Sequence, residues 1–154
     1  MSLAAYRVTK TQSVATAFDG EGARLHGGRW NSVGTRVVDV ASSLSLATLE
    51  LLVHTEDIDM IYGLYSVIRV EFDESLFKKL SRRSLPTGWH SPQPIPETQL
   101  LGDAWIRKGN SPVLEVPSAV SKSEKNYLIN PLHADFSGIK IGKPYPFEPD
   151  ARLR

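Results

Sequence analysis

One stretch, residues 25–50, combines a glycine-rich loop, an apolar strand and a helix, and it reads LHGGRWNSVGTRVVDVASSLSLATLE. Its adjacent glycines let the backbone adopt conformations closed to other residues and let a ligand approach closely. Arg29 follows, and its permanently charged guanidinium can form bidentate hydrogen bonds with a phosphate or carboxylate. Trp30 and Asn31 add a flat aromatic ring and an amide that can donate and accept hydrogen bonds. The residue types alone fit a surface turn with a salt-bridged arginine and a core tryptophan equally well.

The second half of this stretch predicts a strand followed by a capped helix. Three valines indicate a buried strand over residues 36–41, although Asp39 interrupts the apolar run. Ser42 or Ser43 suits the N-cap of a helix over residues 44–54.

Glu50 lies within this otherwise apolar helix, one turn from apolar side chains on either side. A carboxylate on an apolar face is costly to bury unless it is paired or used in chemistry. Two interpretations therefore remain open: a structural ion pair, with Arg29 or Arg36 as the cation, or a functional role.

Length and composition fit a single domain spanning residues 1–154. Hydrophobic residues make up 41% and charged residues 23%, which is ordinary for a globular protein. Eighteen basic and seventeen acidic side chains leave a net charge of +1, which argues against direct nucleic-acid binding. With no apolar run of membrane-spanning length, no signal peptide pattern and no cysteine, we expect a cytoplasmic protein without disulfides or thiolate metal sites.

The remaining chain alternates short strands and helices, which predicts an α+β domain with a mixed, mainly antiparallel sheet. Strands are predicted over residues 5–9, 62–73, 112–117, 126–130 and 139–141. Helices are predicted over residues 13–18 and 97–108, and a short one from Asp73 or Ser75 through Leu80. Residues 19–34 are interpreted as a functional glycine-rich loop, and residues 86–96, with four prolines, as an irregular surface excursion.

Several chemistries find little support in the residue patterns. The four histidines are scattered without metal-ligand spacing, and no phosphate-binding glycine motif is present. Ser118 lacks the glycine-flanked turn of a serine hydrolase. An RNA-cleaving toxin using Arg29, Glu50 and a histidine would require a more basic surface than +1 indicates. The remaining set suits cleavage of an N-glycosidic bond, with Arg29 on phosphate or ribose oxygens and Glu50 stabilising positive charge on the ribose.

Six ordered motifs carry a more specific signal. They read YRV at residues 6–8, HGGRWNSVG at 26–34, SLATLELLVH at 45–54, GDAW at 102–105, VPSA at 116–119 and NYLINP at 126–131. In this combination the chain resembles the RES domain family, which takes its name from an arginine, a glutamate and a serine. The resemblance extends from Tyr6 to about His133, nearly the whole chain.

The resemblance implies a toxin of a bacterial type II toxin–antitoxin pair, partnered by an Xre-like helix-turn-helix antitoxin. It implies a fold related to ADP-ribosyltransferase toxins, and leaves open a homodimer within the antitoxin complex. Family members consume NAD⁺ as substrate, by hydrolysis or phosphorolysis of the nicotinamide–ribose bond, and some transfer ADP-ribose to a protein. No further cofactor and no metal are implied.

Carried over by motif, the name-giving residues are Arg29, Glu50 and Ser118. We interpret Ser118 as a hydrogen-bonding organiser, because no general base is assigned to it. Arg7 matches the first arginine of the family and is expected to grip the substrate phosphates.

Asn31 and Asn126 are expected to support the pocket. At position 39 the sequence departs from the family, which typically has a tyrosine that would stack against the nicotinamide. Asp39 supplies no such surface and adds a second negative charge near Glu50. Asp39 marks either a family member with an altered substrate or lower activity, or an engineered change that disarms the toxin. If Asp39 has ended the chemistry altogether, the chain is a non-catalytic module that binds NAD⁺ or the antitoxin.

Overall fold

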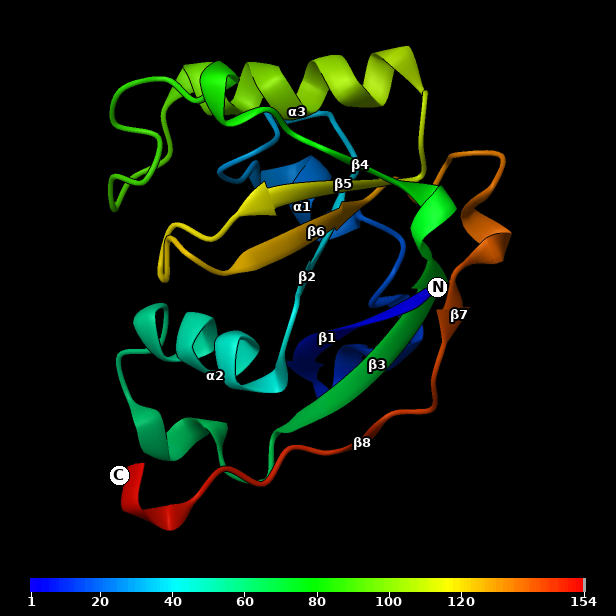
Figure 1. The fold of residues 1–154 in the computed structure, drawn as a ribbon. Helices are drawn as coiled ribbons and strands as arrows, with labels where there is room; N and C mark the ends of the chain where they lie inside the picture. Colours follow the sequence, from blue (N-terminus) through cyan, green and yellow to red (C-terminus); the bar gives the residue numbers. More distant parts are fainter. Residues whose placement is uncertain (154) are drawn as a thin grey trace.

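A curled eight-stranded sheet runs through residues 1–153, the part of the chain that the computed structural model describes (Figure 1). The strand order is β4-β5-β6-β2-β1-β3-β7, and β8 pairs with β3 as well. The strands are β1 Ser2–Lys10, β2 Val38–Ala41, β3 Tyr65–Asp73, β4 Phe77–Lys79, β5 Val113–Pro117, β6 Lys125–Ile129, β7 Lys140–Ile141 and β8 Tyr145–Pro146. Only the β4–β5 pairing is parallel, which confirms the predicted mixed, mainly antiparallel sheet.

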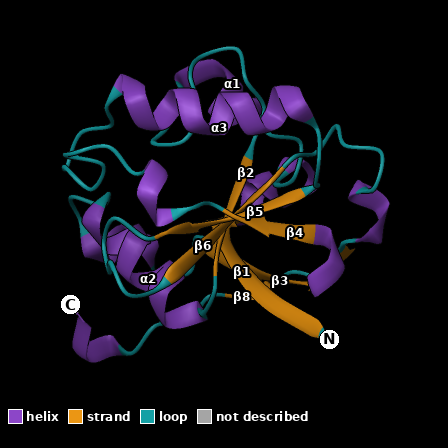
Figure 2. Cartoon of the chain, turned by 45° about the horizontal axis from the view of Figure 1, so that its top comes forward, coloured by secondary structure: helices purple, strands orange, loops and turns teal. Residues whose placement is uncertain are grey.

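Three α-helices flank the sheet: α1 Glu21–His26, α2 Leu44–Val53 and α3 Pro96–Lys108. Figure 2 shows α1 and α3 on one side of the molecule and α2 on another. Trp105 of α3 packs against Leu114 and Leu128 of β5 and β6. Leu46 and Ala47 of α2 pack against Ala41 at the end of β2. No helix within residues 1–153 is long and apolar enough to cross a bilayer.

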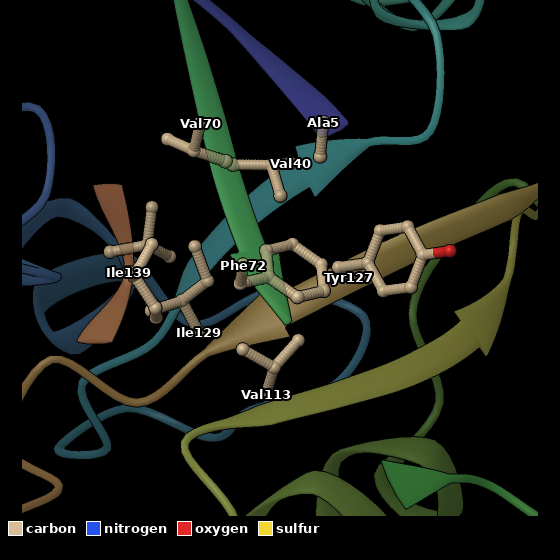
Figure 3. Close-up of a cluster of buried hydrophobic side chains, with 9 residues drawn as sticks. Ala5, Val40, Val70, Phe72, Val113, Tyr127, Ile129 and Ile139 are labelled. Atoms are coloured by element: carbon tan, nitrogen blue, oxygen red, sulfur yellow. The ribbon is translucent and has the colours of Figure 1, made fainter. Parts of the chain in front are cut away.

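The largest core cluster packs between strands of the sheet (Figure 3). It joins strands from both halves of the chain; its buried members are Ala5, Val38, Val40, Val70, Phe72, Val113, Tyr127, Ile129 and Ile139. Phe72 and Tyr127 meet edge to face with ring centroids 5.2 Å apart, a favoured aromatic geometry. Burial of this cluster locks the central strands, and hence the residues at their ends, in fixed positions.

Helix boundaries follow the capping signals in the sequence. The Ser43 side chain accepts a hydrogen bond from the Leu46 backbone N–H at 3.0 Å, as an N-cap should. Pro96 occupies the first turn of α3, and Gly109 ends that helix with φ of +63°, where glycine is favoured. The predicted helices over residues 44–54 and 97–108 are therefore confirmed.

Two predictions were wrong in detail, and one strand was not predicted. Residues 19–34 contain the short helix α1 as well as loop. The helix predicted up to Leu80 is a single 3₁₀ turn, Glu74–Leu76, followed by strand β4, because β4 pairs with β5 and Phe77 packs on the core. The proline-rich tail forms β8 on the edge of β3, where burial of Phe147 overrides its weak strand propensity.

Candidate functional site

Glu50 is held in a fixed orientation by two side chains from the C-terminal half of the chain. The Asn126 amide of β6 donates a hydrogen bond to Glu50 Oε1 at 2.9 Å. The Ser118 hydroxyl, just after β5, donates to Glu50 Oε2 at 3.2 Å. Each carboxylate oxygen thus accepts one hydrogen bond, and the carboxylate also lines an open pocket.

Ser118 is fully buried, with an exposed fraction of 0%. Its oxygen accepts hydrogen bonds from the backbone N–H groups of Val120 and Ser121, each at 3.2 Å. The hydroxyl therefore links the turn after β5 to Glu50: it donates its proton to the carboxylate and accepts two backbone hydrogen bonds.

Burial is the largest influence on Glu50 and raises the pKa of its carboxyl. The hydrogen bonds from Asn126 and Ser118 and the charge of His54 act in the opposite direction and lower that pKa. Within residues 1–153, neither Arg29 nor Arg36 forms an ion pair with Glu50; Arg36 instead pairs with Glu21 at 2.8 Å. The interpretation of Glu50 as half of a structural ion pair was therefore wrong.

A pocket of about 510 Å³ opens above the Glu50 carboxylate. Helix α2 and its C-cap form one wall with four residues on a shared face, Ala47, Glu50, Leu51 and His54. The loop that carries Arg29 forms a second wall, and Pro92 and Pro94 close a third. The excursion over residues 86–96 therefore contributes directly to the pocket, although the sequence indicated only an irregular surface segment.

Arg7 extends from β1 into this pocket. Its Nη1 donates to the backbone carbonyl of Asp39 at 3.1 Å. Its Nε is buried and has no hydrogen-bond partner among the described residues. Burial lowers the pKa of this guanidinium, an effect that the nearby charges of Asp39 and Asp19 oppose. A buried donor without a partner is costly, so Arg7 is suited to receive an anionic ligand.

Arg29 lies across the pocket from α2. Its Nη1 donates to the backbone carbonyl of Trp89 at 2.8 Å, which ties the excursion to the glycine-rich loop. Trp89 also approaches Trp30, with ring centroids 6.4 Å apart. The guanidinium is half-buried, and its desolvation lowers the pKa while the charge of Asp39 opposes that change.

Asp39, on β2, lies at the centre of these charges. Its side chain is exposed by surface area, but it faces a concavity in which surrounding atoms exclude most of the solvent. This desolvation, together with the charge of Glu50, raises the pKa of Asp39 to about 7, and the charges of Arg7 and Arg29 only partly offset the rise. The surroundings of Asp39 therefore favour its neutral form over the predicted second negative charge near Glu50.

A second pocket of about 550 Å³ adjoins the first. The two share Arg7, Arg29 and Asp39 in their linings. Beyond this junction the second pocket is lined by small and polar side chains, including Thr9, Ser13 and Thr16. The site therefore has two chambers that meet at two arginines.

Helix α3 positions the arginine-bearing loop. The Gln99 amide donates to the Gly28 carbonyl at 2.9 Å, and the Asp103 carboxylate accepts from both the backbone N–H and the hydroxyl of Ser32. At Gly102 a Cβ atom would overlap the Trp30 carbonyl oxygen, so only glycine allows this approach. The positioning contacts of Gln99 and Asp103 were not predicted; for Asp103 the signal available was the GDAW motif, whereas Gln99 lies outside that motif.

The predicted site residues fall into three positions. Arg7, Arg29, Asp39, Glu50 and Asn126 line the first pocket together, and Ser118 lies directly beneath Glu50. Asn31 differs, because its amide donates to the backbone carbonyls of Ala23, Ser32 and Thr35, and its side chain borders the second chamber. Asn31 therefore holds the loop in shape from within.

Both the sequence and the fold of the chain match known proteins. The family model of the RES domain matches residues 4–150. The chain is 37% identical over 149 residues to Toxin Res of Photorhabdus laumondii, covering 96% of this chain and 95% of that protein. It is 35% identical over 151 residues to Toxin Res of Yersinia enterocolitica, covering 97% and 98%.

A third relative is the Prs ADP-ribosylating toxin of Sphingobium sp., 34% identical over 143 residues, covering 90% of this chain and 88% of that protein. Among solved structures, the fold matches a chain of the M. tuberculosis MbcT–MbcA toxin–antitoxin complex. The TM-score is 0.77 at 18% sequence identity, over 96% of this chain and 85% of that one. These matches confirm the family and the ADP-ribosyltransferase-like fold that the motifs predicted, and the chain belongs to the RES domain family.

Proposed function

We propose that this chain is the toxin of a toxin–antitoxin pair and that it cleaves the nicotinamide–ribose bond of NAD⁺. The observation that carries the proposal is the Glu50 carboxylate, held by Asn126 and Ser118 and presented to a pocket bordered by two arginines. Its relatives named Toxin Res and its fold match to a toxin–antitoxin complex support the assignment.

Cleavage of the nicotinamide–ribose bond is accelerated by a fixed negative charge beside the ribose. When the bond between the ribose and nicotinamide breaks, its electron pair leaves with the nicotinamide nitrogen, which becomes neutral, and positive charge develops on the ribose. Glu50 stabilises that charge, and because its oxygens are already oriented, little reorganisation is needed during the reaction. An incoming oxygen then bonds to the ribose: in hydrolysis it comes from water, which releases a proton to solvent, and in phosphorolysis it comes from phosphate.

The two-chamber shape suits a dinucleotide. The pyrophosphate would lie at the junction, where Arg7 has an unpartnered Nε and Arg29 borders both chambers. The nicotinamide ribose would then face Glu50, and the adenosine would occupy the chamber near Ser13 and Thr16. The partner in this proposal is an Xre-like antitoxin that neutralises the toxin.

A second candidate is transfer of ADP-ribose to a protein. It is favoured by the relative named as the Prs ADP-ribosylating toxin. The same pocket and the same Glu50 would serve, and only the acceptor would differ. Labelled ADP-ribose would then appear on a protein band instead of free in solution.

The test is nicotinamide release from NAD⁺ by the purified chain, with and without phosphate. Glu50→Gln keeps the shape and removes the charge, and we expect at least a hundredfold loss of turnover. Glu56→Gln, an exposed glutamate beyond the end of α2, is the matched control and should leave turnover unchanged. Turnover that survives Glu50→Gln would overturn the role of Glu50.

Asp39 needs a separate comparison, because it stands where the family typically has a tyrosine. We expect Asp39→Tyr to release nicotinamide faster than the unaltered chain, since it removes a charge beside Glu50 and adds a stacking surface. Equal rates would mean that the pocket functions without the ring. NAD⁺ binding without turnover in both proteins would instead identify a non-catalytic binding module.

A further inference from the structure

A trough on the outer side of α2 is not part of the two-chamber site. It has a volume of about 660 Å³ and lies between α2 and the C-terminal segment that contains β8. Figures 1 and 2 both show the C-terminal end next to the α2 region. The α2 side chains that line it are Leu44, Ser45, Thr48, Leu49 and Leu52, whereas those that line the Glu50 pocket are Ala47, Glu50 and Leu51.

The trough is apolar and open. Leu49 is 42% exposed and Leu153, on the opposite wall, is 44% exposed. Val53, one turn after Leu49, is 55% exposed and extends the apolar surface beyond the trough. A helix that is apolar on all its faces is normally enclosed, but α2 is covered by the sheet on one side only. Such a contiguous apolar surface typically marks an interaction site.

Acidic residues follow the C-terminal end of α2 and lie on the opposite wall of the trough. The sequence has no lysine or arginine from residue 37 to residue 68, and Glu56 and Asp57 follow directly after α2. On the opposite wall Glu148 is exposed, and Asp150 is already paired with Arg152 at 2.8 Å. A partner that matches this rim must carry positive charge.

The backbone of the trough favours a helix over a strand as the bound element. Strand addition needs free N–H and C=O groups along a sheet edge. Here the wall near β8 carries Pro146 and Pro149, which have no N–H to donate. The α2 wall is a ten-residue helix about 15 Å long, so an amphipathic helix of about three turns can lie beside it.

We propose that this trough binds an amphipathic helix of a partner protein, with leucine-like side chains on its apolar stripe and lysine or arginine residues at its edges. The bound helix would cover the outer face of α2, the helix that carries Glu50 on its inner face. The proposal is independent of the reaction assigned to the pocket, because it uses none of the residues that line it.

The test measures binding of a fluorescent 14-residue peptide to the full chain by anisotropy. The peptide carries leucines at i, i+3, i+4 and i+7 and lysines beside them, and two further peptides replace the lysines with glutamates or scramble the leucine spacing. We expect the lysine peptide to bind at least tenfold more tightly than either of the others. Equal affinities, or no binding of the lysine peptide at millimolar concentration, would overturn the proposal.

Variants of the chain locate the binding surface. Leu49→Ser removes an exposed apolar contact in the trough and should weaken binding about tenfold. Leu100→Ser is the matched control, because Leu100 is 61% exposed on α3 and far from the lining of the trough. Glu148→Lys should weaken binding about threefold and reduce its dependence on salt. Equal losses in Leu49→Ser and Leu100→Ser would show that the peptide binds elsewhere, and circular dichroism verifies that each variant is folded.

Discussion

Asp39→Asn provides the sharpest test of the electrostatics of the site. Burial and the charge of Glu50 raise the pKa of Asp39 from its ordinary value of 3.8 to about 7. The folded chain therefore binds this proton more tightly than the unfolded chain does, so raising the pH through this window weakens folding. Asparagine has nearly the same shape but no proton to lose, so it escapes this penalty.

The magnitude follows from the size of the shift. The difference between 3.8 and about 7 corresponds to about 4 kcal/mol for a fully enclosed group. Because the Asp39 side chain keeps exposed surface, solvent screening reduces this figure, and we expect about 1–2 kcal/mol. Asp39→Asn should therefore be more stable than the unaltered chain by that amount at pH 8, and the difference should disappear near pH 4.

Urea denaturation of both proteins at pH 4, 6 and 8 measures this difference directly. Glu97→Gln, which removes an exposed carboxylate in the first turn of α3, controls for the loss of one charge. A stability difference that is the same at pH 4 and pH 8 would refute the reasoning. So would an unaltered chain that is the more stable protein at pH 8.

Three further outcomes are expected. Gly102→Ala should lower the free energy of unfolding by about 2–3 kcal/mol in urea denaturation, because its Cβ overlaps the Trp30 carbonyl; an unchanged midpoint would contradict this. Arg7→Gln should raise the KM for NAD⁺ about tenfold and change the KM for nicotinamide mononucleotide less, since the mononucleotide lacks the pyrophosphate; equal effects in steady-state kinetics would argue against the proposed junction. Ser118→Ala should lower kcat about tenfold or more and leave the KM nearly unchanged, because Glu50 loses one of its two restraints; parallel rises in KM would point to a binding role instead.

The sequence predicted those elements whose signals are local. Ser43 caps α2 and Gly109 ends α3, because capping depends on a few neighbouring residues. Strand β4 was missed, since its pairing with β5 joins segments more than thirty residues apart and overrides the helical tendency of residues 75–80. Long-range pairing of this kind leaves no periodic trace in a single sequence.

In the site, too, features with a local sequence signal were predicted and those that depend on long-range contacts were not. The motifs brought Arg7, Arg29 and Glu50 to attention, and the structure gathers them around one pocket. The wall formed by Pro92 and Pro94 was not predicted, because prolines and an irregular backbone indicate only a loop, and no local signal says which surface a loop covers. The contact of Asp103 with Ser32 was likewise invisible, since the two lie 71 residues apart.

The position of β2 between β1 and β6 has a consequence for the order in which the molecule becomes active during synthesis. Arg7, Arg29 and Glu50 leave the ribosome early, but Glu50 receives its hydrogen bonds only after Ser118 and Asn126 have followed. A nascent chain without residues 125–129 lacks a strand next to β2 and cannot orient the carboxylate. The site is therefore assembled only after residues 118–129 have been made, and a shorter nascent chain lacks the oriented Glu50 carboxylate.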